Sequence, residues 1–290
     1  MENILEITNL TKYYGKVLGV QDLNLNLTKG EVFGFIGPNG AGKSTTIRSI
    51  LGIINKTEGK VLFNGNELVK DDIEMKKLIG YLPSEINLYD DFTVKEMLDF
   101  HEKMFNKNLK ERRQEFVHRL KLDESKRIED LSLGNLKKLG IVLAFMHEPE
   151  LIILDEPTSG LDPIIQQEFY QILEEEKQKG TTILYSSHIL SEVSKICDRV
   201  GIIKNGHLLK VEPVSEIIEK SLSFVTITSK EVEAIIDELH IDVITKTADT
   251  VTFKNTINAN ELLKTLTKYN IEKIYIEPAT LEEIFLHYYE

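Results

Sequence analysis

The sequence has few of the features that mark secreted, membrane-spanning or metal-binding proteins. Its 290 residues include one cysteine, Cys197, which excludes an internal disulfide and leaves no cysteine cluster for zinc. The longest apolar runs, such as IVLAFM at 141–146, are far shorter than the ~20 residues of a membrane-spanning helix. The N-terminus lacks the basic start and apolar core of a signal peptide. We therefore expect a cytoplasmic protein.

Positive charge is also scarce, above all near the C-terminus. The net charge is −12, and residues 211–290 hold 7 Lys and no Arg against 15 Asp and Glu, a net charge of −8. So acidic a region is a poor general binder of nucleic acid, and we expect no such partner. Low-complexity tracts, repeats and coiled-coil heptads are absent from the sequence. The hydrophobic content of 41% is that of an ordinary globular protein.

The strongest local pattern is GPNGAGKS at 37–44, which fits G-x-x-x-x-G-K-[ST] in full. The apolar run EVFGFI before it predicts a buried strand, and TTIRSILGII after it has the apolar spacing of a helix. Glycines in such a turn let backbone N–H groups point at phosphate oxygens, next to the positive end of the helix. Lys43 can then reach the β- and γ-phosphates, and the Ser44 hydroxyl can ligate Mg²⁺. The residues expected to bind ATP here are Gly37, Pro38, Asn39, Gly40, Ala41, Gly42, Lys43, Ser44 and Thr45.

A second apolar run, LIILDE at 151–156, predicts a central parallel strand that ends in two acids. Side chains alternate along a strand, so Asp155 and Glu156 should leave its end in different directions. We assign Asp155 to Mg²⁺ and Glu156 to an attacking water as its general base. Taken alone, the pair would be two solvated acids at a strand end. Its position downstream of the glycine-rich loop favours the functional interpretation.

Two further segments follow. PTSGLDP at 157–163 predicts a rigid turn before a helix from Ile164 to Lys179. TTILYSSH at 181–188 predicts another strand, which ends at His188. A histidine just past a strand is more often a surface residue than a catalytic one. Because ligands gather at the carboxyl ends of parallel strands, we nevertheless expect His188 to face the γ-phosphate.

In this order and spacing, the motifs resemble those of the ATP-binding cassette (ABC) ATPases over roughly residues 4–215. GPNGAGKS resembles the Walker A loop, LIILDE the Walker B strand with the catalytic glutamate, SGLD at 159–162 the D-loop with Asp162, and His188 the switch histidine. The resemblance implies an α/β P-loop NTPase cassette with a mixed core sheet, an antiparallel β subdomain and a helical subdomain. It also implies ATP and Mg²⁺ as cofactors, each ATP lying between two cassettes.

The loop LSLGN at 131–135 falls where the family has its signature loop, usually LSGGQ. Such a loop presents a hydroxyl and backbone N–H groups at a helix N-terminus to the γ-phosphate held by the other cassette. We expect Ser132 to supply the hydroxyl, Gly134 to allow close approach of the backbone, and Asn135 to retain an amide, while Leu133 points away. The alternative is a degenerate loop in an asymmetric pair of cassettes.

A second departure is YLPSE at 81–85. The family usually has a glutamine after YLP, where this chain has Ser84 and then Glu85. Serine is too short to span the same distance to the metal, so a water or Glu85 would have to intervene. In LTKYYGKV, Tyr14 stands where the family carries an aromatic that stacks on the adenine. Strand alternation should turn its neighbour Tyr13 the other way.

The domain boundaries follow from these segments. We expect a cassette at 1–215, with a helical subdomain at about 85–148 where transporter subunits dock, and an accessory domain at 222–290. The C-terminal pattern is β-α-β-β-α-β, which predicts a small α+β, ferredoxin-like domain. The closing TLEEIFLHYYE resembles the tail of ATPases from ABC-2-type exporters. This domain is either a dimer contact or regulatory module, or a cover for the cassette surface.

The sequence therefore predicts the ATPase subunit of an ABC exporter, in which a pair of such subunits, expected to be a homodimer, drives separate membrane-spanning permease subunits. It would lie at the cytoplasmic face of the membrane, held there through the permease. Antimicrobial or amphipathic peptides, or drugs, are the expected substrates. The alternatives are an ABC ATPase without a membrane partner, and a nucleotide-gated scaffold with weak turnover, for which Leu133 and Ser84 are the motivation.

Overall fold

A computed structural model of the chain describes residues 2–105, 107–219, 223–255 and 257–278. The chain divides into two compact units, Met1–Val214 and Ser215–Glu290. Among the described residues, no helix is both long and apolar enough to cross a membrane.

The centre of the first unit is a six-stranded sheet. Its strands, in spatial order, are β10 (His207–Pro213), β9 (Arg199–Lys204), β3 (Val32–Ile36), β8 (Thr182–Ser187), β7 (Leu151–Asp155) and β6 (Ile79–Leu82). Neighbouring strands are parallel except β9 and β10. Strands β3, β7 and β8 consist wholly of buried residues, as continuous apolar runs predict for central parallel strands. Their C-terminal ends therefore meet at one edge of the sheet, where the predicted site residues follow.

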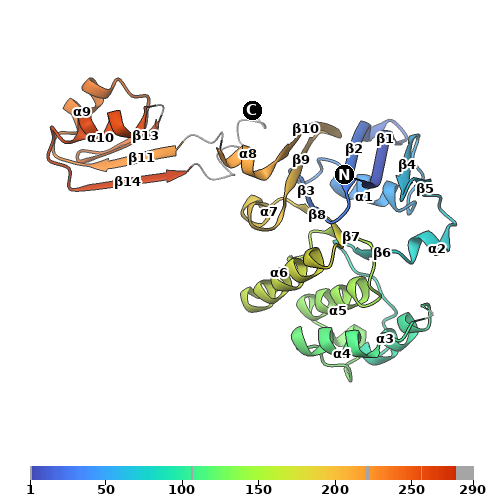
Figure 1. Cartoon of the computed structure of the whole chain (residues 1–290). Coiled ribbons are helices and arrows are strands. Elements are labelled where there is room, and N and C mark those ends of the chain that lie inside the picture. The colour runs from blue at the N-terminus through green and yellow to red at the C-terminus, as the bar shows by residue number, and fades with distance from the viewer. Residues whose placement is uncertain (1, 106, 220–222, 256, 279–290) are drawn as a thin grey trace. The chain divides into compact units, whose positions relative to one another are not determined.

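A second, antiparallel sheet of the first unit is formed by strands from the N-terminal part of the chain (Figure 1). It contains, in spatial order, β2 (Val17–Thr28), β1 (Asn3–Tyr14), β4 (Glu58–Phe63) and β5 (Asn66–Glu67). Helix α1 (Lys43–Ile50) contributes Ile47 and Ile50 to a hydrophobic core shared by both sheets. This helix is shorter than its apolar pattern predicts, because the chain turns at Gly52, whose φ is +65°, before Ile54 is reached.

The first unit contains further helices, three of which form a group. They are α2 (Ile73–Lys76), α3 (Val94–Glu102), α4 (Lys110–Arg119), the 3₁₀ turn η1 (Ile128–Asp130), α5 (Leu133–Phe145), α6 (Pro163–Gln178) and α7 (Leu190–Ile196), with α8 (Val214–Glu219) crossing the boundary between the units. Helices α3, α4 and α5 gather at the end of the unit away from β1 and β2 (Figure 1). Arg119 of α4 joins this group to α6, because its guanidinium pairs with Glu168 at 2.6 Å and with Glu175 at 2.5 Å.

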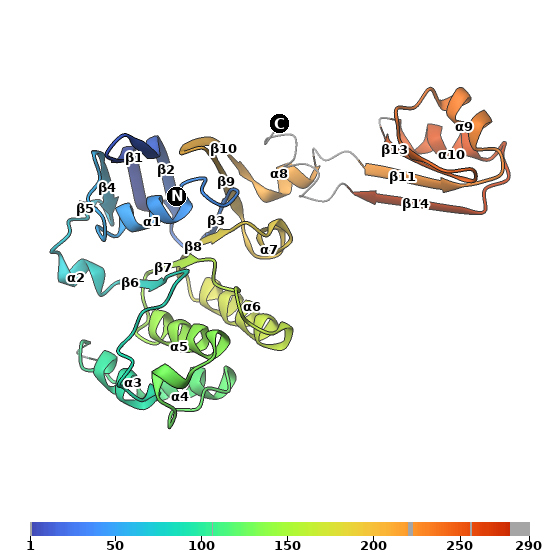
Figure 2. The ribbon, with the colours of Figure 1, turned by 180° about the vertical axis from the view of Figure 1, so that it is seen from behind.

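The second unit is a four-stranded antiparallel sheet with two helices on one face (Figure 2). Its elements in chain order are β11 (Ser223–Thr228), α9 (Val232–Leu239), β12 (Val243–Lys246), β13 (Thr250–Asn255), α10 (Ala259–Leu266) and β14 (Lys273–Pro278). The spatial order β12-β13-β11-β14 and this element order are those of a ferredoxin-like sandwich. The helices cover a core that includes Val225, Ile227, Val251 and Phe253. The closing sequence at 280–290 lies outside the described residues.

Candidate functional site

The loop between β3 and α1 has the backbone of a phosphate cradle. Gly42, directly before α1, has φ +111°, and a Cβ placed on it would lie 2.6 Å from the carbonyl oxygen of Gly19. Gly40 has φ +80°. Side chains would be strained or would clash at these positions, so the glycines are required by the turn itself. The loop is closed by a hydrogen bond of 3.1 Å from the Ala41 N–H to the carbonyl oxygen of Pro38.

An open cavity of about 440 Å³ lies over this loop. It is lined by Tyr14, Val17, Leu18, Gly19, Asn39, Gly40, Gly42, Lys43, Ser44, Thr45, Ser84 and Glu156. The Tyr14 ring is 48% exposed and has the Lys12 ammonium 4.9 Å from its centroid. Tyr13 does not line the cavity, and its hydroxyl lies instead 3.4 Å from Gln21 Oε1. Of the two tyrosines, Tyr14 is therefore the one placed where a base could stack.

Two predicted residues, Lys43 and Glu156, line the cavity, and a third, His188, contacts Glu156. The Lys43 ammonium is buried, donates to the Gly37 carbonyl oxygen at 2.7 Å, and lies 3.4 Å from Glu156 Oε1. The other carboxylate oxygen of Glu156 lies 2.7 Å from Nδ1 of His188. These residues follow β3, β7 and β8, respectively, so the parallel sheet brings together groups that are up to 145 positions apart in the sequence. A phosphate bound in the loop would lie between a cation, a carboxylate and an imidazole.

Asp155 lies at the end of β7 and is not among the residues that line the cavity. It is fully buried at the end of β7, and its Oδ1 accepts a hydrogen bond of 3.2 Å from the Ser186 hydroxyl. Its Oδ2 is buried and has no hydrogen-bond partner among the described residues. A buried carboxylate oxygen of this kind is costly unless a cation or a water satisfies it. Together with the hydroxyl of Ser44, it offers the hard oxygen donors that Mg²⁺ takes beside nucleotide phosphates, so the residues present fit this metal.

The loop 131–135 does not line the cavity. Ser132 is the N-cap of α5, with its hydroxyl accepting from the Asn135 N–H at 3.4 Å. Leu133 is 62% exposed. A Cβ on Gly134 would lie 2.7 Å from the carbonyl oxygen of Gly160, so within one chain this glycine is needed for contact with the D-loop. The sequence predicted that Gly134 is needed for close approach to a nucleotide. The structure adds a second reason for glycine at this position, which is its contact with Gly160.

Two other predicted residues have local structural contacts. Asp162 is the N-cap of α6, and its Oδ1 accepts from the N–H groups of Ile164 and Ile165 at 3.0 Å each. Glu85 is exposed and does not line the cavity, whereas the adjacent Ser84 does. Glu85 is therefore not placed in this structure to substitute for a glutamine in the site.

Buried groups that sequence reasoning missed surround the site. The carboxylate of Glu192 accepts hydrogen bonds from the hydroxyls of Thr158, Tyr170, Tyr185 and Ser187 at 2.7 to 3.2 Å. It therefore joins the turn after Glu156 to the strand end before His188. Lys137 of α5 is 1% exposed, and its ammonium donates to the backbone carbonyl oxygen of Glu156. The burial of Lys137 could have been predicted from the sequence, because it lies on the same helical face as Ile141 and Phe145.

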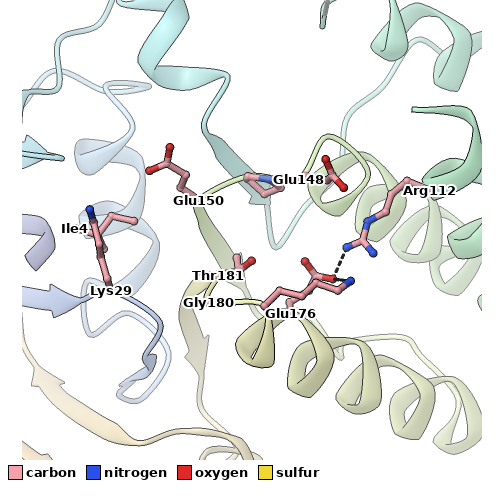
Figure 3. Close-up of a pocket in the computed structure, with 10 residues that line it drawn as sticks. Ile4, Lys29, Arg112, Glu148, Glu150, Glu176, Gly180 and Thr181 are labelled. Atoms are coloured by element: carbon pink, nitrogen blue, oxygen red, sulfur yellow. Dashed lines mark hydrogen bonds and ion pairs between the residues drawn. The ribbon is translucent and has the colours of Figure 1, made fainter. Parts of the chain in front are cut away.

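A second pocket, of about 370 Å³, lies elsewhere in the first unit (Figure 3). Its walls include Lys29, Arg112, Glu150, Glu176 and Lys179. Glu176 is buried and pairs with the guanidinium of Arg112 and, at 3.0 Å, with the ammonium of Lys179. These charges satisfy one another across the pocket, so we assign no ligand to it.

Comparisons with known proteins agree with this geometry. The family described as ABC transporter matches residues 20–159. The bacitracin transport ATP-binding protein BcrA of Bacillus licheniformis is 36% identical over 84% of this chain and 81% of its own length. The lantibiotic transport ATP-binding protein SrtF of Streptococcus pyogenes is 37% identical over 71% of this chain and 89% of its own length. A solved structure titled "Structure of ATP binding subunit of ABC transporter" superposes with a TM-score of 0.69 at 27% identity, covering 91% of this chain and 99% of that one.

Proposed function

Because this chain belongs to the ABC transporter family and is an ATP-binding, ATP-hydrolysing protein, we propose that it powers an exporter whose membrane-spanning permease is a separate chain. The single observation that carries the proposal is the contact of Glu156 with both Lys43 and His188 beside a cavity over a glycine-rich loop. The relatives BcrA and SrtF, which are transport ATP-binding proteins, support the link to transport.

The residues at the cavity suit hydrolysis of a terminal phosphate. The N–H groups of the loop and the Lys43 ammonium bind and orient the phosphates. Glu156 accepts the proton of the attacking water, and His188, 2.7 Å from its carboxylate, orients that base and contacts the γ-phosphate. Ser44 and Asp155 would hold Mg²⁺, which offsets the negative charge that develops on the transferred phosphate. Tyr14 stacks on the adenine.

The same geometry favours a pair of chains. Ser132 and Asn135 lie outside the cavity lining, although their loop ends at a helix N-terminus suited to an anion. A second copy, arranged head to tail, would bring its own loop over the nucleotide and complete the site. We propose a homodimer that closes on two ATP molecules and reopens after hydrolysis.

The helical group α3–α5 offers a surface for the permease. Tyr89, Phe92 and Phe100 form a cluster with ring centroids 5.3 to 6.2 Å apart. Tyr89 is 59% exposed and Phe100 37% exposed, so part of this aromatic surface faces outward. Exposed aromatic clusters of this kind are favoured at protein interfaces. Docking here would place the chain at the cytoplasmic face of the membrane.

The substrate class follows from the relatives. BcrA is named for bacitracin transport and SrtF for lantibiotic transport, so we propose antimicrobial or amphipathic peptides as the exported molecules. The second unit is proposed to be an accessory domain that contacts or regulates the cassette pair.

The proposal is tested first on the purified chain with Glu156→Gln. The amide keeps the shape of the side chain but cannot accept the proton, so kcat should fall by about 10²- to 10⁴-fold while ATP binding is retained. Gel filtration with ATP and Mg²⁺ should then show a dimer that the same variant does not form without ATP. Normal hydrolysis by Glu156→Gln would exclude Glu156 as the base.

The exporter part needs a second measurement. The proposal requires a multi-span permease encoded beside the gene of this chain, and the two proteins are co-expressed and purified together in detergent. Bacitracin should raise the ATPase rate of the complex and leave that of the isolated chain unchanged. Phe100→Ala should weaken complex formation without changing the ATPase rate of the isolated chain. Failure of the two proteins to associate would favour an ABC ATPase without a membrane partner.

A further inference from the structure

Lys137 is a charged residue on the buried, largely apolar face of α5. It lies one turn into α5, and its neighbours on the buried face of that helix include Ile141 and Phe145. Its side chain is 1% exposed. Lysine is almost never buried to this extent unless its ammonium is paired or fully hydrogen-bonded, because the charge loses its hydration.

The ammonium of Lys137 meets that requirement with three backbone carbonyl oxygens. It donates to Ser84 at 3.0 Å, to Pro83 at 3.3 Å and to Glu156 at 3.3 Å. An ammonium has three N–H donors, so these acceptors match its capacity. Burial lowers the pKa of Lys137, and the nearby carboxylates of Asp155 and Glu156 offset part of this effect.

One of these three contacts, together with a backbone hydrogen bond to Ser186, holds the backbone of the proposed base. Glu156 has φ +51°, a left-handed conformation that non-glycine residues adopt at a cost. Its N–H donates to the carbonyl oxygen of Ser186 at 3.1 Å, and its own carbonyl oxygen accepts from Lys137. With both sides of the residue held, the side chain is directed toward Lys43 and His188. A strained backbone persists at a functional position when its surroundings over-determine it.

The same ammonium reaches three functional segments at once. Pro83 and Ser84 follow β6 at the edge of the cavity, Glu156 follows β7, and Lys137 itself belongs to the helix that begins at Ser132. Resting on the proposed role of Glu156, we infer that Lys137 is a positioning residue that holds Glu156 in its reactive orientation and ties it to the helix that begins at Ser132. The connection between Ser84 and Glu156 therefore runs through the Ser84 backbone carbonyl and the Lys137 ammonium. It does not need the short Ser84 side chain.

The test compares three variants on the full-length chain. Lys137→Met keeps an unbranched side chain of similar length but removes the donors, and Lys137→Gln retains two N–H donors without charge. Lys138→Met is the matched control, because Lys138 is the next residue on the helix and is partly exposed. Each variant is measured for kcat, for the Kd of a non-hydrolysable ATP analogue and for its melting temperature.

We expect Lys137→Met to lower kcat by about 10- to 100-fold, the range typical of residues that orient a reacting group, with the Kd of the analogue changed less than about threefold. Lys137→Gln should recover part of the lost rate, and Lys138→Met should match the wild type. A parallel loss of kcat, analogue binding and melting temperature, without recovery in Lys137→Gln, would show a purely structural role and overturn the inference.

Glu156→Gln in the same assay separates this inference from the function on which it rests. If Glu156→Gln is inactive while Lys137→Met hydrolyses ATP at the wild-type rate, the inference fails and the proposed base stands. If Glu156→Gln retains normal activity, the proposed role of Glu156 fails first.

Discussion

Lowering the pH should destabilise the helical part of the first unit through two histidines, of which His147 is buried and His101 is partly buried. His147 is 3% exposed, stacks on Phe105 with ring centroids 4.5 Å apart, and lies 5.6 Å from the ring of His101. Among the described residues, neither ring nitrogen of His147 has a hydrogen-bond partner, nor has Nε2 of His101. Burial lowers the pKa of each histidine from 6.5 to about 4, and for His101 the neighbouring His147 lowers it further.

The sign and size of the effect follow from linkage. The folded chain keeps both rings neutral down to about pH 4, whereas the unfolded chain protonates them near pH 6.5. Their contribution to stability is therefore fully present above pH 6.5 and is lost as the pH falls toward 4. A pH of 5 is 1.5 units below the pKa of 6.5 that the rings have in the unfolded chain. At about 1.36 kcal/mol per unit, each histidine therefore lowers the free energy of unfolding by about 2 kcal/mol at this pH. Two such terms are a large part of the 5–15 kcal/mol that stabilises an average domain.

The assay is urea denaturation of the full-length chain at pH 7 and pH 5, followed by far-ultraviolet circular dichroism. The double variant His101→Leu/His147→Leu has no ring to protonate, so its loss of stability between the two pH values should be smaller than that of the wild type by about 2–4 kcal/mol. His118→Leu, which changes an exposed histidine, should behave like the wild type. Carboxylates contribute equally to all three proteins and cancel in the comparison. Equal pH dependence in the wild type and the double variant would refute the reasoning.

Three further predictions concern the nucleotide site and the loop at 131–135. Tyr14→Ala should weaken ATP binding by about 1–3 kcal/mol of lost stacking, whereas Tyr13→Ala, outside the cavity lining, should change the Kd much less; equal effects by calorimetry would mean that the base does not stack on Tyr14. Leu133→Gly should leave the ATPase rate similar or slightly higher, because Leu133 is exposed. Ser132→Asp should stop hydrolysis, since aspartate keeps the helix cap but repels the γ-phosphate of the second chain. Mixing it with Lys43→Ala should restore activity at one site of each mixed dimer, and no recovery in demonstrated mixed dimers would argue against a loop that acts in trans.

The sequence by itself determined those features whose conformation depends on residues close together in the chain, such as the phosphate loop and the buried strands. The family and the fold class predicted from the motifs are confirmed by the relatives and by the structural likeness. The phosphate loop at 37–44 could be predicted because the need for glycine at Gly40 and Gly42 is a backbone property expressed within a few residues. The strands that end at Asp155 and before His188 were predictable from continuous apolar runs, which are typical of buried parallel strands. Strand topology then places their ends together.

Tertiary structure decided which buried polar groups meet at the site. Lys137 is 19 positions from Glu156 and 53 from Ser84, and the contact of Gly134 with Gly160 joins segments separated by two secondary-structure elements. The four hydroxyls on Glu192 come from α6, from β8 and from the turn after β7. Local patterns predict which face of a helix is buried, but they do not specify the partner that a buried charge will find there. That choice depends on the packing of distant elements, since a buried ammonium or carboxylate is stable only where the completed fold supplies matching donors or acceptors.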